Sequence, residues 1–396
     1  MGLLPYLLIL LISIINLIEV DRAEEYLFPN NENLDIFEYA KELEDNNLLI
    51  YNITYFALIN LIGKETINEI VNEERLYNFL LILAKEYNSN TYPKINPYHN
   101  IYHASHVVQN LYIYLLKSEN KIPLLFEDTY VKEKDELEQS NINYKNLDIF
   151  ALIIAAACHD FRHPGKKKKF YLDYKDKVPF AKILEEYKYN LEPYHYAEAK
   201  KLIEETQLLE LLNNYQKERF YKIMKLVIYG TAGSYTEKHS KDILTYKDII
   251  NMKNIELIKG KIKKDINFKI NNIMKKYYIN QAIDDIKLTI FNCFLFMADN
   301  SITTIKDRYY FIEWSDKIAD ESCLQSIEIH SIDSSKEINC IGNDDEKFRL
   351  SLKKFFESIG DIYFISFCEV FNNLKYLCQN YENNKKFIES KEKIHI

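Results

Sequence analysis

The chain has 396 residues, of which 47% are hydrophobic and 28% charged, so it can bury a large core and lacks the composition of a disordered protein. Its 8 Gly and 8 Pro are too few for sandwiches, barrels and Gly-rich doubly wound sheets, which use these residues in nearly every short connection. A formal net charge of −8 also disfavours nucleic acid as a partner, because binding it requires a basic surface.

An apolar segment dominated by Leu and Ile begins the chain at residues 3–18, and charged residues follow from Asp21. It is short for a membrane-spanning helix and long for the apolar part of a secretory signal, and no basic stretch precedes it. We favour a membrane anchor over a cleaved signal, and both over a buried core helix, because the segment has no polar face. Residues 1–22 are therefore expected to be a membrane segment or signal anchor, with residues 23–34 as a linker.

Helical spacing of apolar residues continues through the rest of the chain, for example over 34–43, 67–83 and 202–212. Two stretches, 147–158 and 286–298, are apolar on all sides and predict central buried helices. Strand alternation is hardly visible, and no internal repeat is present. The sequence thus predicts an all-α fold: one compact multi-helix domain over residues 35–390, with residues 391–396 as a tail.

Four polar segments are expected to form surface loops: 127–145, 166–169, 233–247 and 328–347. The run of four lysines at 166–169 is interpreted as a solvated face, because the whole chain is rich in lysine. The six cysteines, at positions 158, 293, 323, 340, 368 and 378, form no CxxC pair and no disulfide ladder. They are expected to be reduced thiols, which places the domain on the cytosolic side of the membrane.

Five of the nine histidines lie in two short clusters: His99, His103 and His106 in YHNIYHASH, and His159 and His163 in CHDFRHPG. A spacing of four residues places two side chains on one face of a helix. Imidazoles and carboxylates together are ligands for zinc and similar divalent ions, and Asp160 could offer one oxygen to each of two ions.

A single HxxxH pair is weak evidence, since two histidines on a helix face are more often solvated or packed. Here, however, Asp160 ends the apolar stretch ALIIAAACHD, and a Pro-Gly pair stops the chain shortly afterwards. Burying the Asp160 carboxylate without a partner would be strongly unfavourable, so a cation is expected beside it. These residues predict a metal site.

The same segments resemble the catalytic domain of class I 3′,5′-cyclic-nucleotide phosphodiesterases. The family signatures YHNxxHAxDVxQ and HDxxHPG are matched by YHNIYHASHVVQ at 98–109 and HDFRHPG at 159–165. An ADLSNPTK-like segment followed by a WTDRI-like helix is similar to ADNSITTIK followed by WSDKIADE, and LENHHLAxA is similar to LEPYHYAEA at 191–199. The resemblance covers about residues 35–390.

The resemblance implies a compact all-helical domain that binds two divalent ions, usually zinc and magnesium, with manganese as an alternative. The implied metal ligands are His103, His159, Asp160 and Asp299, with Asp160 shared between the ions. A hydroxide between the ions would attack the phosphate of cAMP or cGMP, and His99 would protonate the departing O3′ as general acid. The product would be the 5′-nucleotide, so that the protein controls cyclic-nucleotide signalling. The residues implied to hold the ligands and their waters in place are His163, Glu192 and His195, and Tyr98 is implied to contact the substrate.

Departures from the family pattern fall in the substrate pocket. His106 replaces an Asp, Thr231-Ala232-Gly233 replaces a TDM segment, and Asn300 stands at a different offset from the family's Asn. The family's purine-binding QxxF pattern aligns with SIGD, so Ser358 and Asp361 are placed at the expected substrate contacts.

Two other functions therefore stay open. One is a degenerate phosphodiesterase that binds metal or nucleotide without useful turnover. The other is a His-Asp phosphohydrolase acting on another phosphate ester, which the complete YHN motif disfavours. The preference between cAMP and cGMP and the oligomeric state are left open.

Overall fold

The structure, a computed structural model, describes residues 34–87, 96–128, 142–265 and 272–390. These residues form helices and turns, and no strand occurs among them, which confirms the all-α prediction. None of the described helices is long and apolar enough to cross a membrane. The expected anchor at residues 3–18 lies outside the described ranges.

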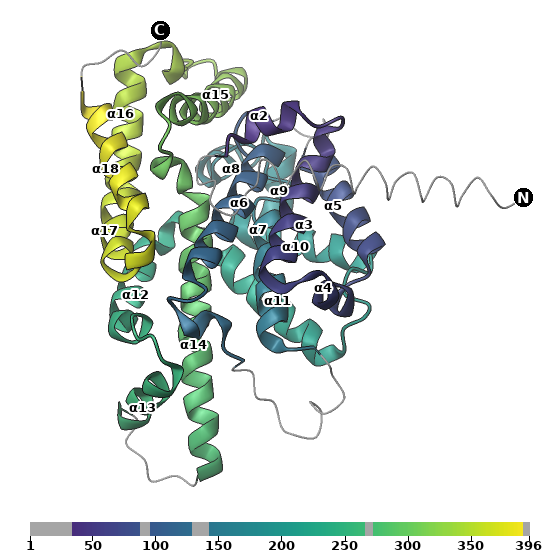
Figure 1. The fold of residues 1–396 in the computed structure, drawn as a ribbon. Coiled ribbons are helices and arrows are strands. Elements are labelled where there is room, and N and C mark those ends of the chain that lie inside the picture. Colours follow the sequence, from purple (N-terminus) through teal and green to yellow (C-terminus); the bar gives the residue numbers. More distant parts are fainter. Residues whose placement is uncertain (1–33, 88–95, 129–141, 266–271, 391–396) are drawn as a thin grey trace, which may run out of the picture.

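The helices follow one another along the whole chain, and Figure 1 shows their arrangement. In the first half they are α2 (Ile36–Lys41), α3 (Leu49–Ile62), α4 (Lys64–Ile70), α5 (Glu73–Tyr87), α6 (Ile101–Ser118), α7 (Tyr144–Cys158), α8 (Lys168–Asp173), α9 (Pro179–Glu185) and α10 (Leu191–Glu205). In the second half they are α11 (Asn214–Gly230), α12 (Thr236–Ile250), α13 (Ile255–Asp265), α14 (Asn272–Asp299), α15 (Arg308–Ile332), α16 (Asp345–Phe355), α17 (Asp361–Val370) and α18 (Lys375–Glu389). A π-helical segment, η6 (Phe356–Gly360), joins α16 to α17.

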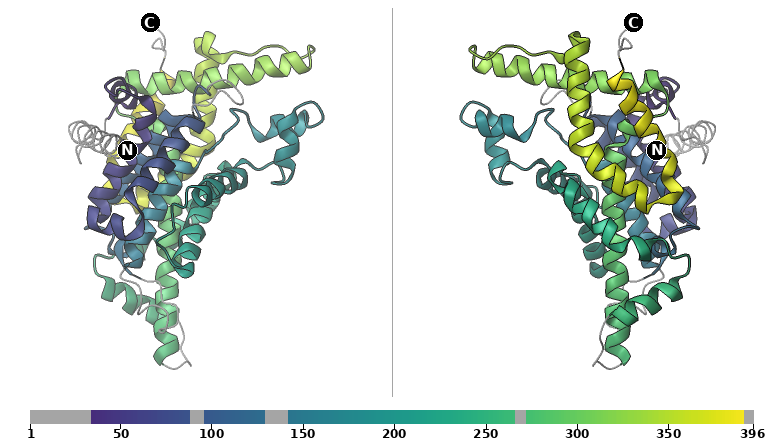
Figure 2. Two further views of the ribbon diagram at one scale, coloured as in Figure 1. Left: turned by 90° about the vertical axis from the view of Figure 1, so that its right-hand side faces the viewer. Right: turned by 90° about the vertical axis from the view of Figure 1, so that its left-hand side faces the viewer.

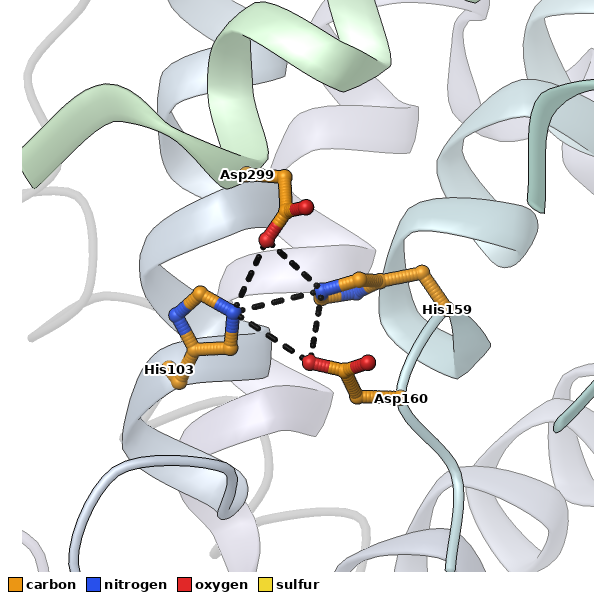
Figure 3. A group of neighbouring side chains, drawn as sticks. All are labelled: His103, His159, Asp160 and Asp299. Atoms are coloured by element: carbon orange, nitrogen blue, oxygen red, sulfur yellow. Dashed lines mark hydrogen bonds and ion pairs between the residues drawn. The ribbon is translucent and has the colours of Figure 1, made fainter. Parts of the chain in front are cut away.

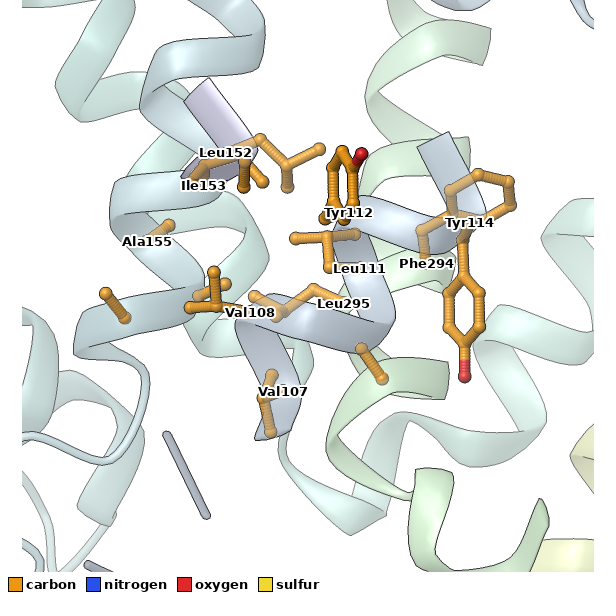
Figure 4. Close-up of a cluster of buried hydrophobic side chains, with 14 of the residues drawn as sticks. Val107, Val108, Leu111, Tyr112, Tyr114, Leu152, Ile153, Ala155, Phe294 and Leu295 are labelled. Carbon is orange, nitrogen blue, oxygen red and sulfur yellow. The ribbon is translucent and has the colours of Figure 1, made fainter. Parts of the chain in front are cut away.

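One hydrophobic core joins helices from both ends of the chain. Helix α7 is buried on nearly every side, as its apolar sequence predicts, and it packs against α3, α6 and α11. Small residues such as Ala155 let these helices approach closely, while Leu111 of α6 and Leu295 of α14 fill the space between them (Figure 4). The second all-apolar stretch, 286–298, forms the buried C-terminal half of α14.

Helix α14 is the long central element, with α6 and α11 packed on one side and α12 on the other (Figure 1). The far end of α15 and the α8–α9 segment project toward the same side of the molecule (Figure 2). Ile329 and Ile332 of α15 pack against a separate apolar cluster that contains Phe170 and Tyr171 of α8. The far end of α15 and the α8–α9 segment are therefore joined by apolar contacts.

A buried ionic cluster joins three of the central helices. Arg219 of α11 donates to both carboxylate oxygens of Asp148 on α7 at 2.7 Å and to those of Asp284 on α14 at 2.6 and 2.7 Å. Lys287 Nζ, also on α14, lies 2.5 Å from Asp148 Oδ2. Each buried charge thus has an opposite charge beside it, which is the condition for burying such groups at all.

Two sequence predictions are wrong: the loop at residues 233–247 and the six reduced cysteines. Residues 233–247 are not a loop, because they form a short 3-10 turn and most of α12, whose Ile243 is fully buried. The polar sequence hides a narrow apolar face that packs on α14 and α17.

The cysteines require the second correction. Only Cys158 and Cys293 are free thiols, and both are buried. The other four form the disulfides Cys323–Cys340 and Cys368–Cys378. The two cysteines of each disulfide are 17 and 10 residues apart, respectively, so no short sequence motif predicts the pairing.

Candidate metal centre and active site

Four side chains from three helix ends converge on one point (Figure 3). His103 lies in the first turn of α6, where Asn100 caps the helix by accepting from the backbone N–H groups of Tyr102 and His103. His159 follows the last residue of α7 and is itself followed by Asp160. Asp299 is the last residue of α14. The four expected ligands are therefore brought together, although they lie up to 196 positions apart.

The distances between their donor atoms suit a tetrahedral ion. His103 Nε2 lies 3.1 Å from Asp299 Oδ1, 3.4 Å from Asp160 Oδ2 and 3.3 Å from His159 Nε2. His159 Nε2 lies 3.2 Å from Asp160 Oδ2 and 3.4 Å from Asp299 Oδ1. Bonds of about 2.0 to 2.1 Å around a tetrahedral zinc would separate the ligand atoms by roughly 3.3 Å. The donor set of two imidazoles and two carboxylates therefore fits a zinc ion.

Hydrogen bonds outside the cluster orient its imidazoles. His159 Nδ1 lies 2.8 Å from the carbonyl oxygen of Ala156 and donates to it, which leaves the Nε2 lone pair facing the other ligands. His195 of α10 is held in the same way, since its Nδ1 donates to the carbonyl of Phe161 at 2.8 Å.

Asp160 faces two groups at once. Its Oδ2 belongs to the cluster of His103 and His159, whereas its Oδ1 lies 3.7 Å from Nε2 of His195. That nitrogen is buried and has no hydrogen-bond partner among the described residues. A carboxylate oxygen beside an unprotonated imidazole nitrogen is a second position where a hydrated cation fits, because both atoms accept hydrogen bonds from water.

The turn after Asp160 brings His163 against His99. Gly165 has a φ of +66°, and a Cβ there would lie 2.3 Å from Oδ1 of Asn96, so glycine is required. Asn96 in turn donates to the carbonyl oxygen of His163 at 2.5 Å. The rings of His163 and His99 stack with their centroids 3.8 Å apart.

His99 does not join the four-residue cluster, since its Nε2 lies 4.0 Å from Asp160 Oδ2. Its Nδ1 contacts Glu321 Oε1 of α15 at 2.5 Å, and Glu321 Oε2 accepts from the backbone N–H groups of Tyr98 and His99. Burial lowers the pKa of His99, but the carboxylates of Glu321 and Asp160 outweigh it and raise the pKa to about 9. The His99 ring is therefore held at the edge of the cluster in its protonated form.

Glu321 is the functional residue that the sequence analysis missed. It lies in WSDKIADE, the segment compared with the family's helix, but 222 positions separate it from His99. The only signal was a glutamate two turns beyond Trp314 on the same helix. Such a signal does not identify the histidine that it contacts.

A cavity of about 710 Å³ opens beside the cluster, a volume typical of small-molecule sites. Its lining includes Tyr98, His99, His163, Glu192 and Asp299. Burial, together with the carboxylates of Asp160 and Asp299, raises the pKa of Glu192. The segment that replaces TDM, residues 231–233, also lines this cavity.

The late helices line the cavity with residues other than those expected. Ser351, Phe355 and Ile359 face it, whereas Ser358 and Asp361 are not among its lining residues. The exposed Ser358 donates to the carbonyl oxygen of Phe355. Asp361 accepts from the hydroxyl of Tyr381 at 2.9 Å and from Lys385 Nζ at 2.6 Å. The structure therefore does not bring the two expected substrate contacts to the pocket.

His106, which replaces the family's Asp, is part of the packing beneath the site. Its ring stacks on Trp314 with centroids 5.1 Å apart, and Ser301 Oγ lies 3.4 Å from its Nδ1. Burial lowers the pKa of His106 to about 3. The residue is thus a neutral imidazole.

Comparisons with known proteins agree on a family. The family described as 3′5′-cyclic nucleotide phosphodiesterase matches residues 98–381, more than two thirds of the chain. The chain belongs to this family.

The 3′,5′-cyclic-AMP phosphodiesterase 4 of Dictyostelium discoideum is 28% identical over 218 residues, which are 52% of this chain and 17% of that protein. The cGMP-specific 3′,5′-cGMP phosphodiesterase 3 of the same organism is 27% identical over 184 residues, 46% of this chain and 33% of its own length. The matched region is thus a third or less of these relatives.

Solved structures share the fold. LmjPDEB1 in complex with IBMX has a TM-score of 0.61 at 16% identity, with 92% of each chain covered. The phosphodiesterase domain of the Salpingoeca rosetta rhodopsin phosphodiesterase fusion has a TM-score of 0.60 at 17% identity, covering 90% of this chain and 97% of that one. The all-helical architecture described above is therefore the one that these catalytic domains have.

Proposed function

We propose that this protein hydrolyses a 3′,5′-cyclic nucleotide, cAMP or cGMP, to the 5′-nucleotide and so controls cyclic-nucleotide signalling. The observation that carries the proposal is the convergence of His103, His159, Asp160 and Asp299 beside a cavity that also holds the His99–Glu321 pair. Family membership supports the same reaction.

The metal site would contain zinc at the four-residue cluster and magnesium or manganese beside Asp160 Oδ1. Two imidazoles and two carboxylates suit zinc, whereas a single carboxylate oxygen with room for water suits magnesium. Bound there, the two ions would lower the pKa of water and neutralise phosphate oxygens.

The protein's own groups would divide the remaining work. His99, protonated at neutral pH because its pKa is raised to about 9, gives its Nε2 proton to the departing O3′. Glu321 holds the Nδ1 side of that ring and thereby aims Nε2 into the cavity. His163 and His195 lie beside Asp160, and Glu192 lines the cavity. These three side chains would orient the waters there, while Tyr98 would contact the substrate.

The test is turnover of cAMP and of cGMP by purified protein, stripped with a chelator and reloaded with zinc plus magnesium or manganese. Asp160→Ala is expected to lose metal and activity together, because it removes an oxygen from each proposed position. Asp248→Ala, an exposed carboxylate on α12, is the matched control and should change neither. An inactive Asp160→Ala protein with full metal content would contradict the two-ion proposal.

A degenerate phosphodiesterase is the second candidate, and the part of the pocket that α16 and η6 line favours it. From α16 and η6, the residues that line it are Ser351, Phe355 and Ile359, and none carries an amide that could recognise a purine. Such a protein would bind metal and nucleotide but would release no 5′-nucleotide in the same assay.

The sequence also carries a proposal about location. We propose that residues 3–18 attach the protein to a membrane with the catalytic domain facing the cytosol. The two disulfides instead favour the opposite face, because persistent disulfides are typical of oxidising compartments. Protease treatment of sealed vesicles, with and without detergent, decides between the two faces, and carbonate extraction tests attachment itself.

A further inference from the structure

The lysine run, which the sequence analysis interpreted as a solvated face, forms part of the wall of the active-site cavity. Lys166, Lys167 and Lys168 all line the cavity, together with Asn190 and Gln325. The turn is held there because the backbone N–H of Lys167 donates to Gln325 Oε1 of α15 at 2.8 Å. Only Lys169 of the run is not a lining residue.

The charges of the four lysines are balanced unequally. Lys166 is buried and its ammonium pairs with Glu328 at 2.8 Å, while Lys169 pairs with Asp173 at 2.9 Å. Lys168 Nζ contacts an uncharged partner, Asn190 Oδ1, at 2.6 Å. Among the residues that the structure describes, neither Lys167 nor Lys168 has a carboxylate within ion-pair distance. Two positive charges without an ion-pair partner among these residues therefore lie on the wall of a cavity that Asp299 of the metal cluster also lines, and the charge of Lys168 acts on the carboxylate of Glu192.

The contact of Lys168 with Asn190 connects it to the start of α10, which lines the same cavity. Its partner Asn190 directly precedes α10, whose second residue is Glu192. Glu192 lines the cavity together with Asp299 and Lys168, and the charges of Asp160, Asp299 and Lys168 all act on its carboxylate. A ligand with an anionic group at the metal centre would therefore share this cavity with the Lys168 side chain and with the end of α10 that Lys168 contacts.

We propose that Lys168, assisted by Lys167, contacts the phosphate of a nucleotide in this cavity and favours the 5′-nucleotide product over the cyclic substrate. The proposal rests on the proposed function. A cyclic phosphodiester carries one negative charge, whereas a phosphate monoester carries about −1.5 to −2 at neutral pH. Two ammonium groups stabilise the more highly charged ligand more strongly, so product binds tightly and inhibits.

The experiment measures binding of 5′-AMP and 5′-GMP to the metal-loaded full chain by calorimetry, with adenosine and guanosine as uncharged probes. Lys167→Gln/Lys168→Gln is compared with Lys169→Gln, which removes one exposed charge outside the cavity. We expect the double variant to bind 5′-nucleotide about three- to tenfold more weakly, as the loss of exposed charge contacts predicts. The difference should shrink at about 0.5 M salt, and Lys169→Gln should match the unmodified protein.

Steady-state kinetics supply the second measurement. In the double variant the inhibition constant of the product should rise more than the KM of the cyclic substrate. Equal losses for nucleotide and nucleoside would overturn the proposal, because the lysines would then act on the base, the sugar or the fold. Unchanged nucleotide binding in the double variant, or no binding by the unmodified protein, would also overturn it.

The two proposals fail in different ways. Lysine-dependent binding of 5′-nucleotide without hydrolysis of either cyclic nucleotide would remove the proposed activity and leave the phosphate contact standing. Hydrolysis with lysine-independent product inhibition would do the reverse.

Discussion

The imidazole of His99 and the carboxylate of Glu321 depend on each other for their charge states. Burial alone lowers the pKa of the imidazole, and only the neighbouring carboxylates raise it to about 9. The same contact lowers the pKa of Glu321 to about 2, against the effect of burial, which raises it. Each residue therefore keeps the other ionised across the neutral range, where a general acid must carry its proton.

Replacing His99 by Asn should leave the metal content unchanged and lower kcat about 10²- to 10⁴-fold, the usual contribution of a group that protonates a leaving oxygen. Metal analysis and single-turnover kinetics on the same preparation check this. Metal loss in step with activity would instead make His99 a ligand.

Replacing Glu321 by Gln should move the alkaline limb of the pH profile of kcat/KM to lower pH. A general acid is active below its own pKa, where it still carries its proton. The substitution removes the carboxylate that contributes most to raising the pKa of His99, so burial should lower that pKa. Glu313→Gln, an exposed residue on the same helix, is the control and should leave the limb in place. An unmoved limb in Glu321→Gln would mean that another group sets it.

At the scale of elements, one face of α16 and η6 supplies the late side chains that line the cavity. Ser351, Phe355 and Ile359 follow one another at a spacing of four residues and line the cavity, whereas Ser358 is exposed. A match to a short sequence pattern does not show which face of a helix meets the cavity.

Phe355→Ala should raise the KM for a cyclic nucleotide about tenfold, since loss of an aromatic surface against a base costs on the order of 1 to 3 kcal/mol. Ser358→Ala should leave KM unchanged, because Ser358 is exposed outside the cavity. The reverse ranking of the two variants would restore SIGD as the purine site.

The ionic cluster of α7, α11 and α14 predicts a pH-dependent loss of stability. Arg219→Leu should lower the free energy of unfolding by about 3 to 5 kcal/mol at neutral pH, because it strands buried carboxylates. Burial raises the pKa of Asp284, but Arg219 outweighs it and the pKa is lowered below its usual value. Because folding lowers the pKa of this carboxyl group, its ionisation stabilises the folded state at pH values above the unfolded-state pKa. This contribution to the free energy of unfolding is lost as the pH falls through the folded-state pKa.

The difference in the free energy of unfolding between Arg219→Leu and the unmodified protein should therefore be largest near neutral pH. It should become smaller below about pH 4. Urea unfolding monitored by circular dichroism at several pH values measures it. A constant difference across this range would show that the arginine acts through packing alone.

For the whole molecule, the two disulfides have similar loop lengths but different positions. Cys323–Cys340 ties α15 to the segment before Ile341, and Ser322 and Ile341, beside its two cysteines, line the cavity. Cys368–Cys378 ties α17 to α18, and neither its cysteines nor their neighbours line the cavity. One disulfide thus holds the wall of the substrate site, and the other holds only the fold.

Cys323→Ser/Cys340→Ser and Cys368→Ser/Cys378→Ser should each lower the free energy of unfolding by about 3 kcal/mol, as loop closure predicts for loops of this size. Only the first pair should also raise the KM for cyclic nucleotide. Thermal unfolding and steady-state kinetics check both effects. Alkylation of the denatured, unreduced protein should label Cys158 and Cys293 alone, and labelling of all six cysteines would contradict the pairing.

The sequence by itself determined the features that arise within a few residues. The scarcity of Gly and Pro and the spacing of apolar residues predicted the helices, because each helix face is set by local periodicity. The two short His clusters and the Asp beside His159 predicted where a metal would bind, since ligands on one turn stay together wherever that turn packs. Asp299, however, was identified only through the family resemblance.

Tertiary structure alone decided the contacts between distant segments. The pairing of His99 with Glu321, of Cys323 with Cys340, and of Lys168 with the end of α10 all depend on how whole helices pack. The lysine run illustrates the reason. Its polarity is the same on a solvated face and on the wall of a polar cavity, so composition cannot separate the two. Only the approach of α15, through Gln325 to the backbone of Lys167, places the run at the active site.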